Sequence, residues 1–171
     1  MNAKSLDIVV LLKLAADGRV KPYAELSKEL RISASEVHAA VKRCIEAGLI
    51  ERESRRLLRK PVEEYLLHGV RYAFPAQHGP VARGLPTAYA APPLASQISS
   101  EDLPPVWPDP EGQMKGFAIE PLYRSVPQAA RSDPKLYELL ALVDAVRIGR
   151  ARERQLAAEE LKKRLMHANT H

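Results

Sequence analysis

The distribution of proline divides this chain of 171 residues into three parts. Twelve of its fourteen prolines lie between residues 73 and 134, among them the pairs Pro92-Pro93 and Pro104-Pro105. Because proline lacks the backbone N–H that an interior helix position donates, long helices are excluded from most of this segment. The sequence therefore predicts three units, which are a first folded unit at residues 1–72, a proline-rich extended arm and linker at 73–132, and a helical segment at 133–168.

At the entrance to the proline-rich part, residues 70–74 are predicted to form a strand, and residues 83–90 are predicted to form an extended run. Together they would form an elongated, wing-like arm, followed by a linker at 96–116 that its prolines keep extended. Trp107 lies in this linker. It is interpreted as an anchor that holds the linker on a folded surface, with an aromatic for binding a partner as the less favoured alternative.

The first unit contains a helix that is predicted to begin at Ala34. Ser33 and Glu36 have the spacing of a capping box, in which each side chain binds the backbone N–H of the other residue. Gly48 is placed to end the helix in a left-handed conformation. One face of the helix is apolar and is formed by Val37, Ala40, Val41, Cys44 and Ile45. The opposite face is small, polar and partly basic and carries Ser35, Glu36, Ala39, Lys42, Arg43 and Glu46, with His38 near its border.

A shorter helix precedes this one, marked by Tyr23, Leu26 and Leu30, and the turn at residues 31–33 has the length found in a helix-turn-helix. In that motif the second helix enters the major groove of duplex DNA, which is about 12 Å wide. A further helix at residues 5–16 is apolar on two sides. It needs two packing partners, which are the helix-turn-helix core and either a second subunit or the chain's own C-terminal helices.

Residues 25–51, ELSKELRISASEVHAAVKRCIEAGLIE, resemble the bacterial winged-helix transcription regulators of the broad MarR-like kind. The resemblance implies a fold that is mainly α with a small β wing, a winged helix-turn-helix domain joined here to the proline-rich arm and the C-terminal helices. It also implies a sequence-specific protein that binds double-stranded DNA, acts as a homodimer and represses transcription. Regulators of this kind often bind a small-molecule effector, but the sequence indicates no particular ligand.

The segment after Ile50 departs from the usual wing of two strands and a tight turn. A basic run at 51–60 leads into Pro61 and a helical pattern at 62–68. Because a wing lies along the DNA backbone, the run is interpreted as contacting phosphates, with a solvated surface as the alternative. The residues predicted to contact DNA are Ser33, Ser35, His38, Ala39, Lys42, Arg43, Arg52, Arg55, Arg56 and Arg59.

The charge balance is compatible with this partner. The net charge is +5, and residues 1–75 hold fourteen Lys and Arg against ten Asp and Glu, whereas residues 76–171 hold twelve against eleven. The excess lies in the part predicted to bind DNA. Because it is modest, non-specific attraction to phosphates is expected to be weak and sensitive to salt.

Other classes of function find little support in the sequence. There is no Gly-rich phosphate loop, no GxSxG turn and no histidine pair at metal-ligand spacing. An enzyme, a cofactor and a metal centre are therefore not expected. The single cysteine, Cys44, is interpreted as a core residue rather than a redox switch. No apolar run is long enough to span a bilayer, so a cytoplasmic protein with no membrane association is expected.

The C-terminal part begins with a helix signal, Asp133 as the cap and Pro134 at the first position. One amphipathic helix is predicted up to Gly149 and a second, highly charged one over 150–166. These helices are interpreted as a dimerisation segment, with a site for a protein partner as the alternative. Residues 136–154 are similar to the tails of small winged-helix proteins encoded beside nucleotidyltransferase-like genes. The second functional hypothesis is accordingly an antitoxin-like module that binds a toxin enzyme through residues 133–168 and regulates its own operon.

Overall fold

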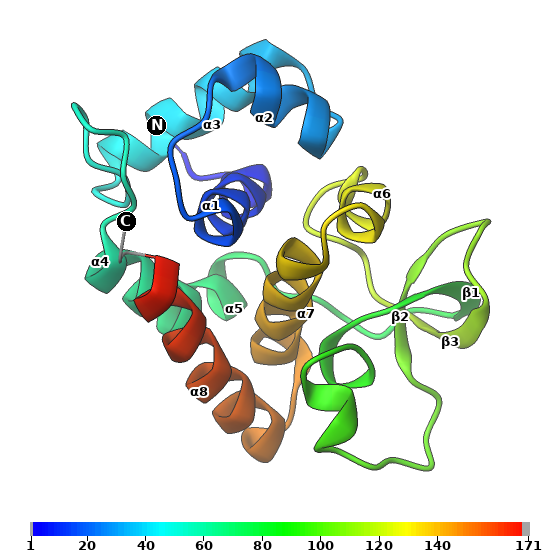
Figure 1. The fold of residues 1–171 in the computed structure, drawn as a ribbon. Helices are drawn as coiled ribbons and strands as arrows, with labels where there is room; N and C mark the ends of the chain where they lie inside the picture. The colour runs from blue at the N-terminus through cyan, green and yellow to red at the C-terminus, as the bar shows by residue number, and fades with distance from the viewer. Residues whose placement is uncertain (1, 169–171) are drawn as a thin grey trace.

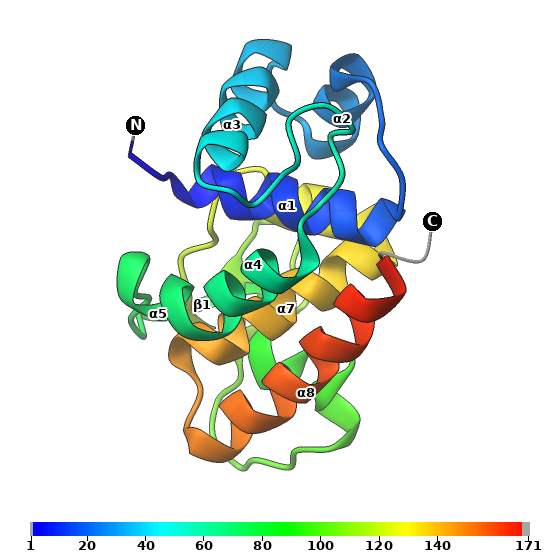
Figure 2. The ribbon, with the colours of Figure 1, turned by 90° about the vertical axis from the view of Figure 1, so that its left-hand side faces the viewer.

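Helix α1 (Ser5–Asp17) lies across the middle of the molecule, with α2 and α3 on one side and the C-terminal helices on the other (Figure 2). The computed structural model, which describes residues 2–168, buries every apolar side chain from Leu6 to Ala15. α1 packs on α3 and also on α7 and α8. The second partner of this helix is therefore the chain's own C-terminal part, one of the two alternatives that the sequence left open.

The helix-turn-helix has the predicted boundaries. α2 (Tyr23–Leu30) is followed by α3 (Ala34–Glu46). The capping box of α3 is present, because the Ser33 hydroxyl accepts a bond from the backbone N–H of Glu36 and the Glu36 carboxylate accepts one from that of Ser33, both at 3.2 Å. Gly48 has a φ of +77°, the left-handed conformation that glycine adopts at little cost.

The wing is a minimal hairpin, closed by a single β-bridge between Ile50 and Leu57. It leads directly into α4 (Arg59–Glu64), a π-helical turn (Tyr65–Gly69) and α5 (Val70–Ala73). The predicted strand at 70–74 is therefore wrong. Val62, Leu66 and Val70 are buried and recur every four residues, so packing of one helical face overrides the β propensity of the local sequence.

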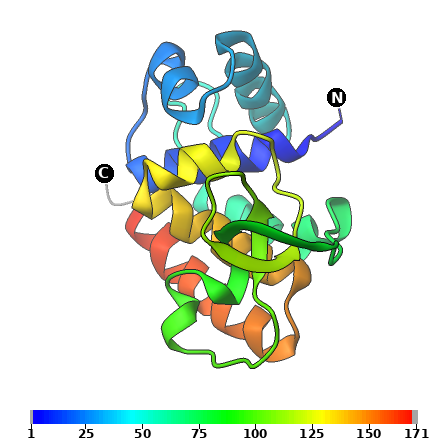
Figure 3. The same ribbon diagram turned by 90° about the vertical axis from the view of Figure 1, so that its right-hand side faces the viewer.

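The proline-rich part folds into a small sheet that lies on one side of α7 rather than projecting as an arm (Figure 3). β1 (Val81–Pro86) pairs antiparallel with β2 (Pro105–Pro108) and with β3 (Met114–Ala118), and β2 and β3 are parallel. Two strands therefore occupy the segment that was predicted as a linker, and that prediction is wrong. The prolines of β2 are its first and last residues, where a missing N–H disturbs the pairing least.

Trp107 fixes this sheet to α7, as the anchor interpretation predicted. Its side chain is only 1% exposed, and its indole N–H donates to the Asp144 carboxylate at 2.7 Å. The Thr87 hydroxyl donates to the same oxygen at 2.7 Å, and Arg147 pairs with the other oxygen at 2.9 Å. The buried Asp144 carboxylate on α7 thus binds Trp107 of the sheet, Thr87 just after β1, and Arg147 of its own helix.

The C-terminal part consists of α6 (Val126–Arg131), α7 (Pro134–Ile148) and α8 (Ala151–Ala168). Asp133 caps α7 as predicted, because its carboxylate accepts a hydrogen bond from the Leu136 N–H at 3.1 Å. α7 is not the amphipathic helix that was expected, since all residues from 139 to 146 are buried. α1, α5, α6, α8 and the turn at Ala88–Ala90 surround it. Figure 1 shows α7 in this central position.

A buried lysine connects the two halves of the fold. Lys13 on α1 forms ion pairs with Asp133 at the start of α7 at 2.6 Å, with Glu29 on α2 at 2.7 Å and with Asp17 at 3.2 Å. These contacts join the helix-turn-helix to the C-terminal helices. Because one ammonium group meets three carboxylates, its charge is compensated in spite of burial.

Candidate nucleic-acid interface

The outward face of α3 is free of the rest of the described chain over most of its length. Ser33, Ser35, His38 and Lys42 are exposed, and Ala39 is half-buried. The inward residues, Val37, Ala40, Val41 and Cys44, are buried. α3 lies at one end of the molecule, where a duplex can approach it (Figure 1). The capping box places the start of the helix at Ala34, and burial of the apolar stripe leaves the opposite face exposed to solvent.

Arg43 does not belong to that outward face, and the prediction that it does is wrong. Its side chain is 9% exposed and points toward α1, where its guanidinium binds both carboxylate oxygens of Asp7, with a shortest distance of 2.8 Å. Arg43 lies at the border of the apolar stripe, and its long side chain reaches inward from there. Its role is to hold α3 on α1.

On one flank of α3, the predicted DNA-contacting residues His38 and Arg55 both contact Tyr23, which was not among the predicted site residues. Tyr23, at the start of α2, meets the ring of His38 edge-on at 5.4 Å, and the Arg55 guanidinium lies 5.0 Å over the tyrosine ring. A hollow of about 220 Å³ between α3 and the wing is lined by His38, Lys42, Arg52 and Arg55, together with Tyr23, Ile45 and the acidic Glu46. The wing is therefore held close to the recognition helix, with its basic groups beside the outward face.

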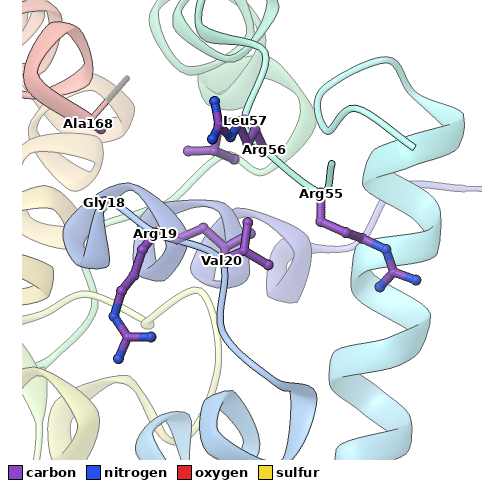
Figure 4. A pocket seen from close by; sticks show the side chains of 8 residues that line it. Gly18, Arg19, Val20, Arg55, Arg56, Leu57 and Ala168 are labelled. Carbon is purple, nitrogen blue, oxygen red and sulfur yellow. The ribbon is translucent and has the colours of Figure 1, made fainter. Parts of the chain in front are cut away.

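The remaining wing residues lie elsewhere. Arg56 lines a second pocket, of about 290 Å³, together with Arg19 and Leu57. Figure 4 shows that the Arg55 side chain points toward α3, whereas those of Arg56 and Arg19 point in other directions, so the three guanidinium groups do not converge on one anion. Arg59 is the first residue of α4 and is half-buried. Only Arg52 and Arg55 of the predicted wing residues share a hollow with α3.

The opposite flank of α3 contains a contact that sequence analysis missed. The Tyr123 hydroxyl, in the segment before α6, donates to the Glu36 carboxylate at 3.0 Å. Tyr123, Ser35, Glu36 and Ala39 line a hollow of about 280 Å³ on this side of the helix. The two residues joined by the hydrogen bond are 87 positions apart, so no local signal in the sequence could have connected them.

Cys44 lies at the inner side of α3 and is 1% exposed, which confirms its interpretation as a core residue. Burial, together with the nearby Asp7 carboxylate, raises the pKa of the Cys44 thiol to about 12. The thiolate is the nucleophilic form, so we expect native protein to react with a disulfide reagent far more slowly than protein unfolded in denaturant. Comparing the two rates at one pH measures this, and equal rates would contradict the buried thiol.

Two further features of residues 2–168 bear on the candidate chemistry. No group of three or more His, Cys, Asp and Glu side chains in this part of the chain is arranged to hold a metal ion. None of its helices combines the length and the apolar character that crossing a bilayer requires.

The comparison with protein families decides what the helical pair is. A family model described as winged helix-turn-helix DNA-binding matches residues 4–51. Residues 4–51 are a winged helix-turn-helix DNA-binding domain. The match covers α1, α2 and α3 and ends where the wing begins, so the prediction from the sequence is confirmed for this part. No curated protein and no solved structure matches the chain. The winged helix-turn-helix domain supports DNA as a partner.

Proposed function

We propose that the protein is a transcriptional regulator that binds double-stranded DNA in a sequence-specific manner, with α3 in the major groove. The observation that carries this proposal is the exposure of Ser35, His38 and Lys42 on α3 beside Arg52 and Arg55 of the wing. The first three can reach base edges and the two arginines can reach phosphates. The buried face of α3 is meanwhile packed on α1, which holds the helix in place.

We infer in addition that two copies act together and that they repress transcription in the cytoplasm. A single recognition helix reads few base pairs, so two copies on inverted half-sites would supply the longer site that selective binding needs. A bound pair excludes other proteins from the same DNA without any further activity. The apolar residues 139–146 of α7 are buried within the chain, so two copies of the protein would associate through a different surface.

The antitoxin-like alternative gains no specific support. It places the binding site for an enzyme in residues 133–168, and within this segment all residues from 139 to 146 are buried in the chain's own core. On α8 the buried residues are Ala157, Leu161 and Leu165, which also face inward. The charged residues Arg152, Glu159, Lys162 and Lys163 are among the exposed residues of α8.

The test is a gel-shift titration with DNA from upstream of the protein's own gene, at two salt concentrations. Replacing Lys42 by alanine is expected to weaken binding about tenfold, because a contact to a base or phosphate is worth about 1–3 kcal/mol. Lys162→Ala is the matched control, since this lysine is exposed on α8, away from α3. The control should bind as the natural protein does.

A footprint measures the other parts of the proposal. Two protected half-sites one helical turn apart are expected, and binding should fall as salt is raised. If the natural protein does not distinguish this DNA from an unrelated duplex of equal length, sequence-specific regulation is the wrong conclusion. If Lys42→Ala binds like the control, α3 does not enter the groove through this face.

A further inference from the structure

We propose that the DNA-contacting surface extends beyond the winged-helix domain to Arg124, which binds a phosphate on the strand opposite the one that the wing contacts. This inference rests on the proposed function and specifies a second group of contacts. Arg124 lies in a segment about 70 positions after residue 51, where the matched domain ends. The chemical partner is the backbone of duplex DNA.

The segment that carries Arg124 is fixed beside α3. Just before it, the backbone carbonyl of Leu122 accepts a hydrogen bond from the Ser5 hydroxyl at 2.6 Å, and the Leu122 side chain is buried. Just after it, Ser125 and Val126 are buried at the start of α6. Tyr123 is held by its bond to Glu36 on α3. The backbone on both sides of residue 124 is therefore anchored.

The Arg124 side chain is exposed, and its guanidinium lies 4.8 Å over the Tyr123 ring. No carboxylate within residues 2–168 forms an ion pair with it. The nearby Glu36 carboxylate is occupied by the Ser33 N–H and the Tyr123 hydroxyl. The tyrosine ring attracts the positive charge of the guanidinium and accepts no conventional hydrogen bond from its N–H groups, so Arg124 can donate to a phosphate from this position.

Lys4 adds a second exposed cation to the same flank. It lines the hollow of about 280 Å³ that also contains Ser35, Ala39 and Tyr123. The backbone N–H of Lys4 donates to the Asp7 carboxylate at 2.8 Å, which fixes residue 4 at the start of α1, and Asp7 in turn binds Arg43 of α3. The flank is thus formed by two separate segments of the chain, each with a basic side chain at its surface.

The arrangement of the two flanks indicates how DNA would lie. Ser35 and Ala39, one turn apart, form the row of α3 that faces Tyr123, and His38 and Lys42 form the row that faces the wing. A helix in the major groove has one phosphate backbone on each side. Arg52 and Arg55 would contact one strand, and Arg124 with Lys4 the other.

Tyr123 is a positioning residue in this proposal. Its hydroxyl holds the Glu36 carboxylate, and this hydrogen bond lowers the pKa of Glu36 below its ordinary value. The ring of Tyr123 supports the Arg124 guanidinium at the same time.

The test compares Arg124→Ala with Arg152→Ala, an exposed arginine of α8 on another part of the surface. Binding of the full-length protein to its upstream DNA is measured over a range of salt concentrations. Arg124→Ala is expected to weaken binding about three- to tenfold and to reduce the salt slope by about one, as loss of one phosphate contact does. Arg152→Ala should change neither the affinity nor the slope, and both variants should keep the circular dichroism of the natural protein.

Tyr123→Phe adds a measurement that does not depend on DNA. Loss of the hydroxyl should raise the pKa of Glu36 toward its ordinary value, as followed by NMR, while the phenyl ring keeps supporting Arg124. An unchanged Glu36 pKa would overturn the positioning contact. Unchanged affinity and slope in Arg124→Ala, with Lys42→Ala still weakened, would overturn this inference alone. Absence of DNA binding by the natural protein would overturn the proposed function and this extension with it.

Discussion

Replacing Arg43 by alanine is expected to destabilise the protein by about 3–5 kcal/mol, because it leaves the Asp7 carboxylate buried without its partner. The two side chains are 9% and 4% exposed, and three guanidinium–carboxylate contacts of 2.8 to 3.1 Å join them. The pair connects α3 to α1, so its loss loosens the recognition helix. The free energy of unfolding is measured by urea denaturation followed by circular dichroism.

Lys42 provides the matched control for this prediction. It precedes Arg43 on α3 and is exposed, so Lys42→Ala should change stability by less than about 0.5 kcal/mol. The double variant Asp7→Asn, Arg43→Met should recover part of the loss, since no uncompensated charge remains. Equal stability of Lys42→Ala and Arg43→Ala would show that the buried pair does not stabilise the fold. Lys42→Ala should therefore lower DNA affinity and leave stability unchanged, whereas Arg43→Ala should lower stability.

Replacing Trp107 by alanine should destabilise the protein by a comparable amount, about 3–5 kcal/mol, because it leaves a cavity where an indole was buried. The change also removes the N–H that donates to Asp144 at 2.7 Å. Thr87 and Arg147 would still bind this carboxylate, but the sheet would lose the indole that packs on α7. Since Trp107 is the sole tryptophan of the chain, unfolding is followed by circular dichroism rather than fluorescence.

Two further variants separate the contributions at this position. Trp107→Phe keeps much of the apolar volume and loses the hydrogen bond, so a smaller loss of about 1–3 kcal/mol is expected. Tyr72→Ala removes an aromatic side chain that is 73% exposed and should cost less than about 0.5 kcal/mol. A cost for Trp107→Ala no larger than that for Tyr72→Ala would mean that the sheet is held by other contacts.

The candidate site was predictable in part. The exposed residues of α3 were identified from the sequence because the apolar stripe of Val37, Ala40, Val41 and Cys44 determines which face is outward. Arg43 could not be placed, since it lies at the border of that stripe and its direction depends on Asp7, 36 positions earlier. Tyr123 and Arg124 could not be predicted for the same reason. The residue of α3 that Tyr123 contacts, Glu36, is 87 positions earlier in the chain.

Local signals were enough to place helix ends at the capping box of Ser33 and Glu36, at Gly48 and at Asp133, because these signals act between residues at most four positions apart. Tertiary contacts determine that Val70 lies in a helix, that a sheet forms in the proline-rich segment, and that α7 is buried on all sides over residues 139–146. Those outcomes depend on partners far away in the chain. Leu85, for example, pairs with Trp107, and Trp107 in turn binds Asp144. Such pairings are stabilised only after the chain has folded back on itself, so a local pattern can indicate the elements but not the contacts that they finally make.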